Sequence, residues 1–335
     1  MSVGLYSRTS VCTADPDEAI RVAAERMQKE GVGMLVVVDG GFPVGVVTDR
    51  DVALCASDTA LVAEVMSSPA VAVRANSSVA EAVSLMGRRG VRRVAVVDAD
   101  RRLNGLLAAD DVLRLVASEV AGLAAVAAAQ MPGEPEPEAE AAGDEVAASH
   151  YAGEVVSVRA DARVEAAIAA MKEHAVGCVA VTGESNQPAG LLTDRDIATK
   201  VIARGVDRAS TLVSAVMSTP AVSCDASAPL EEIVDQMRRH AIRRVLITRA
   251  GELAGIVTFD DLVATFGDEL HGLGEAARRQ VRREQRRTQA EHVRDEVVDK
   301  LQEAATRLRQ AGGDAMSALG KEVEGLREKV RRWRE

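Results

Sequence analysis

The six residues VVTDRD, from Val46 to Asp51, return almost unchanged as LLTDRD, from Leu191 to Asp196. Looser copies are LLAADD, from Leu106 to Asp111, and IVTFDD, from Ile256 to Asp261. Each copy follows an apolar run and precedes a helix-like run, and a glycine stands directly before it: Gly45, Gly105, Gly190 and Gly255. Repetition in one context indicates a structural unit that occurs four times.

The residues before Asp51 predict the contents of that unit. MLVVVD, Met34 to Asp39, is typical of a buried strand, and PVGVVT after the Asp-Gly-Gly turn predicts a second strand. Asp15–Glu30 predicts a helix with Asp15 or Asp17 as its cap and Pro16 in its first turn. Its apolar face comprises Ile20, Ala23, Ala24 and Met27. DRDVALCA then begins a second helix.

The same order of elements recurs three times. The equivalents of the buried strand are RVAVVD, CVAVTG and RVLITR, at 93–98, 178–183 and 244–249. Helices are expected before them at Ser77–Arg89, Asp161–His174 and Ser227–His240. A short strand precedes the helix, as in Ala70–Val73 and Ala221–Cys224. Each unit therefore has the order β-α-β-β-α.

The four units form two pairs. VMSSPAVAV, Val65 to Val73, matches VMSTPAVSC, Val216 to Cys224, and RRGVRRVAV matches RRHAIRRVLI. Both matches place an equivalent segment between the first and second unit of a pair. Between the pairs, Met131–Glu145 is rich in Pro and Glu and has no apolar periodicity, which predicts an extended acidic linker.

The composition changes in the C-terminal tail. A heptad stripe predicts a helix there, in a hairpin or a coiled coil, and comprises Met316, Leu319, Val323, Leu326, Val330 and Trp333. Arg278–Arg287 carries six arginines and one glutamate. This cluster is either a solvated helix face or a surface for RNA, a ribosome or an acidic protein.

Composition excludes several classes of protein. The 335 residues are 47% apolar but only 2% aromatic, so a base-stacking surface is not expected. The net charge of −10 argues against a polyanion-binding surface over the whole chain. No apolar stretch is long enough to span a membrane and no signal peptide is evident, so we expect a cytoplasmic protein. The scattered cysteines and histidines predict no metal site, and no catalytic motif occurs.

The repeated motif has a structural and a functional interpretation. Thr48 or Asp49 can cap the following helix, and Asp51 can favour its dipole. Alternatively, the end of the strand and the start of the helix together present a hydroxyl, N–H groups and a carboxylate, which suit a sugar diol and a phosphate. A glycine inside a strand often marks the close approach of another group.

Four copies of Gly-apolar-apolar-Thr-x-x-Asp, each in a strand–strand–helix context, resemble the CBS domain, and the pairs resemble Bateman modules. The resemblance covers Val3 to Gly267 except the linker. It implies an α/β fold of four β-α-β-β-α units in two pseudo-twofold pairs, followed by a helical tail. The expected domains are units at 1–57, 62–125, 149–207 and 213–268, modules at 1–125 and 149–268, a linker at 130–148 and a tail at 275–335.

In the resembled family, adenine nucleotides or adenosyl compounds bind in the cleft between paired units. By motif, the ribose carboxylates would be Asp51, Asp111, Asp196 and Asp261. The neighbouring hydroxyls would be Thr48, Thr193 and Thr258. The phosphate-binding residues would be Arg50, Arg195, Arg92, Arg93, Arg243 and Arg244. Ala108 replaces the expected Thr in the second unit, so we expect the second module to bind more tightly than the first.

The resemblance implies a regulatory protein rather than an enzyme. We expect it to sense AMP, ADP, ATP or adenosylmethionine, with or without magnesium, and to form a homodimer or larger assembly through its modules and tail. The alternative is a structural or interaction protein with vacant clefts. Such a protein would act through the tail, with Arg278–Arg287 contacting RNA, a ribosome or an acidic protein.

Overall fold

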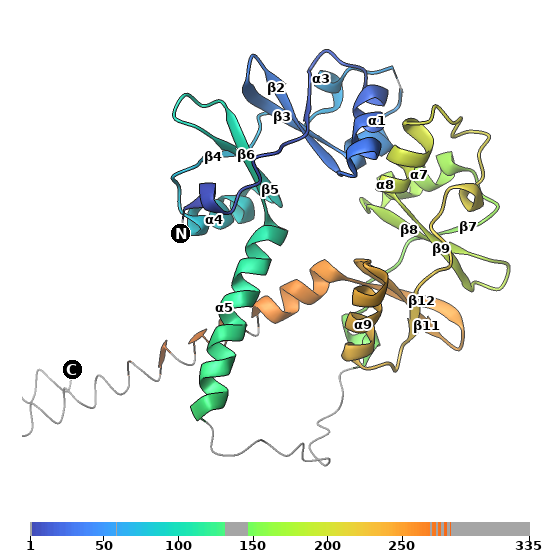
Figure 1. Ribbon diagram of the computed structural model, residues 1–335. Coiled ribbons are helices and arrows are strands. Elements are labelled where there is room, and N and C mark those ends of the chain that lie inside the picture. The colour runs from blue at the N-terminus through green and yellow to red at the C-terminus, as the bar shows by residue number, and fades with distance from the viewer. Residues whose placement is uncertain are drawn as a thin grey trace, which may run out of the picture. The chain divides into compact units, whose positions relative to one another are not determined.

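The computed structural model describes residues 2–57, 59–130, 147–268, 270–272, 274–275, 278–279 and 282 (Figure 1). The chain divides into two compact parts, Met1–Phe259 and Asp260–Glu335. The predicted linker at Met131–Glu145 and the heptad stripe of the tail lie outside the described residues. Of the arginine cluster, only Arg278, Arg279 and Arg282 are described. No helix of the described ranges has the length and apolar character needed to cross a membrane.

Each repeat contains a helix and a three-stranded sheet, and in repeats 1 to 3 a further helix follows the last strand. Repeat 1 contains η1 (Val3–Leu5), β1 (Thr13–Ala14), α1 (Ile20–Glu30), β2 (Met34–Asp39), β3 (Phe42–Thr48) and α2 (Asp49–Leu54). Repeat 2 contains α3 (Val62–Val65), β4 (Ala72–Arg74), α4 (Val79–Arg89), β5 (Arg93–Val97), β6 (Leu103–Ala108) and α5 (Ala109–Gln130).

The second pair repeats this order. Repeat 3 contains α6 (Ala148–Tyr151), β7 (Ser157–Arg159), α7 (Val164–Glu173), β8 (Cys178–Thr182), β9 (Pro188–Thr193), α8 (Asp194–Asp196) and the π-helix η2 (Ile197–Ile202). Repeat 4 contains η3 (Val213–Ala215), β10 (Ser223–Asp225), α9 (Leu230–His240), β11 (Arg244–Arg249) and β12 (Glu252–Thr258). In every sheet the first two strands are parallel and the last two antiparallel, so the helix between the first two is a crossover. The predicted α/β fold is confirmed.

The first helix begins later than the sequence predicts. The expected start at Asp15 is wrong, because α1 begins at Ile20 and Ala19 precedes it without a side-chain cap. The carbonyls of Pro16 and Glu18 instead accept the N–H groups of Ala63 and Val62, each at 2.9 Å. These are N–H groups of the first turn of α3, which have no partner within that helix. The segment before α1 therefore caps another helix.

The glycine before each motif marks the interface between paired repeats. Val46 of β3 and Ser67, which follows α3, exchange backbone hydrogen bonds of 3.0 and 2.9 Å. A Cβ atom on Gly45 would lie 3.0 Å from the Ser67 carbonyl oxygen. The same exchange occurs at Arg8 with Leu106, Gly153 with Ile256 and Leu191 with Ser218. The predicted close approach is confirmed, and the approaching group is the backbone of the paired repeat.

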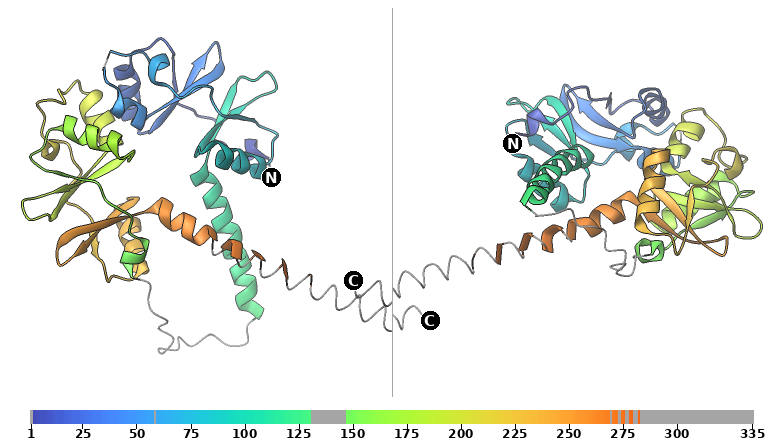
Figure 2. Two further views of the ribbon diagram at one scale, coloured as in Figure 1. Left: turned by 180° about the vertical axis from the view of Figure 1, so that it is seen from behind. Right: turned by 60° about the horizontal axis from the view of Figure 1, so that its bottom comes forward.

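Repeats 1 and 3 also share one hydrophobic core. It includes Ile20 and Val52 from repeat 1 with Ile168 and Ile197 from repeat 3. Figures 1 and 2 show the blue helices of repeat 1 beside the yellow-green helices of repeat 3, and α2 contacts both α7 and α8. Hydrogen bonds cross the same junction, including Gln28 Nε2 to the Thr199 carbonyl at 2.9 Å. The two modules are therefore joined by buried side chains.

Two carboxylates lie at this junction. Asp49 and Asp194 begin α2 and α8, which contact each other. Burial raises the pKa of Asp49 to about 6, and the charge of Asp194 acts in the same direction. Burial also raises the pKa of Asp194. Ionisation of Asp49 therefore opposes folding at neutral pH.

The close approach at Gly190 predicts a steric cost. In Gly190→Ala the Cβ would lie 2.7 Å from the Ser218 carbonyl oxygen, which must move. We expect a loss of about 1–3 kcal/mol in the free energy of unfolding. Gly87→Ala in α4 is the control, because no atom lies within 4 Å of its Cβ, and it should gain about 0.5–1 kcal/mol. Urea unfolding measures the free energy of unfolding of both variants. Equal changes in the two variants would contradict the close contact between Gly190 and Ser218.

Asp49→Asn should stabilise the protein in a pH-dependent way. The folded chain binds the Asp49 proton more tightly than the unfolded chain, so the cost is full above pH 6 and shrinks as the pH falls from about 6 toward 4. We expect a gain of about 1–2 kcal/mol at pH 7.5 and most of it lost at pH 4.

Thermal unfolding at both pH values measures this difference. Asp39→Asn is the matched control, because Asp39 is an exposed carboxylate at the end of β2. Because Asp39 is exposed, its replacement should change the unfolding temperature little. The same gain for Asp49→Asn at both pH values would show that the charge of Asp49 is not the cause.

Candidate ligand-binding clefts

The Thr-x-x-Asp motif forms the same local structure in repeats 1 and 3. Thr48 Oγ1 accepts the Asp51 N–H at 3.3 Å, while Asp51 Oδ2 accepts from Thr48 N and Oγ1 at 2.8 and 2.7 Å. Thr193 and Asp196 make the equivalent three bonds, of 3.1, 2.9 and 2.6 Å. This is a reciprocal cap of the helix, so the structural interpretation of the motif is confirmed. One oxygen of each carboxylate is thereby occupied.

A cavity of about 530 Å³ adjoins the motif in repeat 1. Asp51 and Arg50, two of the predicted site residues, both line it. Its other walls are the end of α2 and the segment through α3, including Leu54, Cys55 and Val65. The cavity therefore places two carboxylates, of Asp51 and Glu64, and one guanidinium beside apolar side chains, a set that can hold a polar ligand with one apolar face.

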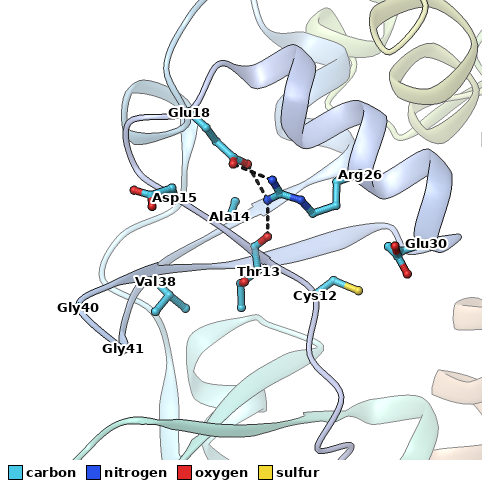
Figure 3. Close-up of a pocket in the computed structure, with 10 residues that line it drawn as sticks. All are labelled: Cys12, Thr13, Ala14, Asp15, Glu18, Arg26, Glu30, Val38, Gly40 and Gly41. Atoms are coloured by element: carbon cyan, nitrogen blue, oxygen red, sulfur yellow. Dashed lines mark hydrogen bonds and ion pairs between the residues drawn. The ribbon is translucent and has the colours of Figure 1, made fainter.

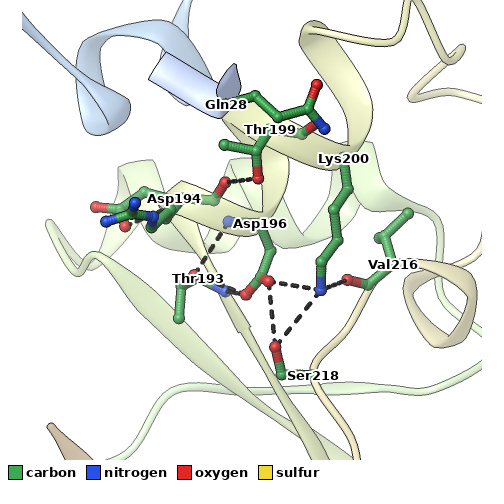
Figure 4. A network of polar contacts seen from close by, with 9 residues as sticks. Gln28, Thr193, Asp194, Asp196, Thr199, Lys200, Val216 and Ser218 are labelled. Atoms are coloured by element: carbon green, nitrogen blue, oxygen red, sulfur yellow. Dashed lines mark hydrogen bonds and ion pairs between the residues drawn. The ribbon is translucent and has the colours of Figure 1, made fainter. Parts of the chain in front are cut away.

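In repeat 3 the aspartate lies in a closed polar network (Figure 4). Lys200 Nζ lies 2.7 Å from Asp196 Oδ1 and donates to the Val216 carbonyl at 2.9 Å. Ser218 Oγ donates to Asp196 Oδ1 at 3.2 Å. With Thr193 on Oδ2, both oxygens of Asp196 are engaged, and the residue is only 8% exposed.

The aspartate of repeat 2 has a different partner. Arg8 Nη2 lies 2.8 Å from Asp111 Oδ1, and Ala108 N donates to Oδ2 at 3.3 Å. Ala108 has no hydroxyl, so two of the three bonds of the cap are missing here. In repeat 4, Thr258 ends β12, and Asp261 lies in the second compact part; each has an interaction partner.

Four of the predicted phosphate-binding arginines affect the pKa of the two carboxylates at the junction of repeats 1 and 3. The charges of Arg195 and Arg93 oppose the rise in the pKa of Asp49 that burial causes. Those of Arg244 and Arg50 oppose the rise in the pKa of Asp194. One of these arginines comes from each repeat. The charges of all four therefore act on these two carboxylates.

The remaining two arginines share one carboxylate. Arg92 Nη2 donates to Asp110 Oδ1 at 3.0 Å, and Arg243 Nη1 donates to Oδ2 at 2.9 Å. Although burial acts in the opposite direction, these guanidiniums lower the pKa of Asp110. The Arg243 guanidinium also lies 4.5 Å from the centre of the Phe259 ring. Asp110 therefore links repeats 2 and 4.

A second cavity of about 600 Å³ lies elsewhere in repeat 1, and no predicted site residue lines it (Figure 3). Arg26 crosses it to Glu18 with two bonds of 2.9 Å and to the Thr13 carbonyl at 2.5 Å. Asp15 and Glu30 also line it. This acidic lining suits a phosphate poorly.

Several residues of these networks were not predicted from the sequence. Asp110 and Ser218 gave no separate signal, and the sequence suggests Asp49 only as a helix cap, a position that Thr48 takes. Lys200 follows Asp196 by four residues, a spacing that pairs side chains on a helix, so that contact could have been anticipated. Among the described residues, no group of three or more His, Cys, Asp or Glu side chains could hold a metal ion.

Comparisons with known proteins fit this architecture. The CBS domain family matches residues 3–57, 62–118, 148–203 and 213–268. The CBS domain-containing protein YhcV of Bacillus subtilis is 40% identical over 109 residues, which are 32% of this chain and 76% of YhcV. Protein MK0525 of Methanopyrus kandleri is 32% identical over 122 residues, which are 34% of this chain and 62% of that protein. The chain thus spans less than two thirds of MK0525.

One solved structure resembles most of the chain. Protein MJ1225 of Methanocaldococcus jannaschii covers 79% of this chain and 100% of its own, with a TM-score of 0.58 and 17% sequence identity. At that identity the likeness shows a shared fold. The four family matches cover more than half of the chain and coincide with the four repeats. The chain therefore belongs to the CBS-domain family, with four CBS domains arranged as two Bateman modules.

Proposed function

We propose that the chain is a regulatory protein that senses adenine nucleotides or adenosyl compounds in the clefts of its CBS pairs and catalyses no reaction. The proposal rests on basic groups that all four repeats contribute. In a chain of net charge −10, an arginine from each of the four repeats acts on the same junction. Such a concentration of guanidiniums favours binding of a phosphate group.

The cavity of repeat 1 supports the assignment of the sugar. Asp51 uses Oδ2 for the helix cap, and its carboxylate still lines the cavity beside Arg50. A carboxylate can accept from both hydroxyls of a ribose, and the neighbouring guanidinium can bind a phosphate. The proposal thus assigns ribose to Asp51 and phosphate to Arg50.

The alternative function uses the tail. A protein with vacant clefts would act through Arg278–Arg287, most of which lies outside the described residues. In the described part, Arg278 and Arg279 lie 3.7 and 2.9 Å from Glu275 carboxylate oxygens. Self-association likewise stays a prediction, which sedimentation of the full-length protein at micromolar concentration tests.

Calorimetric titration of the full-length protein with AMP, ADP, ATP and adenosylmethionine tests the proposed function. We expect saturable binding of at least one of them. GMP is the control for the base, and it should bind more weakly. An absence of binding by all four adenine ligands would overturn the proposal and favour the alternative.

Two substitutions should separate the sugar from the phosphate. Asp51→Asn should weaken binding of AMP and of adenosine by about ten- to a hundredfold, because it removes a charged acceptor of the ribose hydroxyls. Arg50→Met should weaken AMP by a similar factor but leave adenosine nearly unchanged. The control Arg159→Met removes an exposed guanidinium paired with Asp161. If Arg50→Met lost the same factor of affinity for AMP and for adenosine, the assignment of Arg50 to the phosphate would be contradicted.

A further inference from the structure

The clefts of repeats 1 and 3 differ although their sequences match. VMSSP and VMSTP align Val65 with Val216 and Ser67 with Ser218. In repeat 1, Asp51 and Val65 line an open cavity of about 530 Å³. In repeat 3, the ammonium group of Lys200 bridges the equivalent residues, Asp196 and Val216. The lysine therefore lies where repeat 1 has space for a ligand.

The local backbone places Lys200 there. The helix after Asp196 continues as the π-helix η2, whose wider turn is often found at functional sites. Lys200 follows Asp196 by four residues and returns to its carboxylate. At the equivalent position the other repeats have Cys55, Leu115 and Thr265. A cation at this position occurs in repeat 3 alone of the four.

The contacts of Asp196 leave little capacity for a sugar. A carboxylate binds a diol by accepting from two hydroxyls. Asp196 Oδ2 already accepts from Thr193, and Oδ1 accepts from Ser218 and contacts Lys200. The Lys200 side chain is 34% exposed and that of Asp196 only 11%. A diol that displaced the ammonium would leave it beside the Val216 carbonyl without its carboxylate, which is unfavourable in a partly buried site.

We propose that Lys200 is the specificity-determining residue of the repeat 3 cleft. It takes the place of the ribose hydroxyls on Asp196, so the cleft of repeat 1 binds a ribose and that of repeat 3 does not. This inference rests on the proposed function, because it concerns the same class of ligand. The sequence predicts tighter binding by the second module, because Ala108 removes a hydroxyl from the first. This inference reverses that prediction, because Lys200 occupies the carboxylate of Asp196.

Titration of the full-length Lys200→Met variant with adenosine and AMP tests this proposal. Methionine keeps most of the stem and removes the charge. We expect one additional adenosine site per chain that the wild type lacks. The double variant Lys200→Met/Asp196→Asn should lose the additional site. Lys172→Met is the control, since Lys172 is exposed on α7, and it should bind as the wild type does.

The outcomes separate this inference from the proposed function. Wild-type binding with no additional site in Lys200→Met would overturn the inference and leave the proposed function intact. Weaker AMP binding in Lys200→Met would also overturn it, since Lys200 would then be a phosphate ligand. No binding by any variant would overturn both. Thermal unfolding of each variant checks the fold, and Lys200→Gln, which keeps a polar end without the charge, provides a second uncharged variant with the same expected gain.

Discussion

The backbone exchange between paired repeats is the constraint on which the clefts depend. The third strand of each repeat bonds to the segment that leads into its partner, and a glycine in that strand leaves room for the approach. The exchange brings Ser218 to the carboxylate of Asp196 and Arg8 to that of Asp111. The motif aspartates of repeats 2 and 3 consequently contact the lead-in segment of the paired repeat.

The shared core of repeats 1 and 3 adds a second level of organisation. Because helices from both modules bury one another, the charged ends of α2 and α8 are carried into a partly desolvated junction. Burial raises the pKa of both carboxylates there, and arginines of several repeats oppose that effect. An anion that binds there would contact guanidiniums next to carboxylates whose pKa is raised by burial.

Much of the fold was predictable because its signals are local. Strands Met34–Asp39 and Arg244–Arg249 have the predicted bounds, and the glycines correctly indicated a close approach. The start of α1 was not predictable, since the carbonyls before it serve α3, a contact set by tertiary structure. The packing of repeat 1 on repeat 3 has no signature in either segment alone. Of the candidate site, the motif gave the helix caps, and the contact of Lys200 with Asp196 follows from a four-residue spacing. The contact of Ser218 with Asp196 depends on the backbone exchange, which the sequence does not show.

Asp110 has a consequence for communication between the modules. Its two oxygens hold one guanidinium from repeat 2 and one from repeat 4. An anion that draws Arg243 away removes one of the two guanidiniums that lower the pKa of Asp110, and Arg92 becomes its principal counter-ion. Binding of an anion at one of these guanidiniums thus changes the free energy of anion binding at the other. Thermodynamic linkage makes that influence equal in both directions, so two ligands on opposite modules would sense each other without any change in backbone conformation.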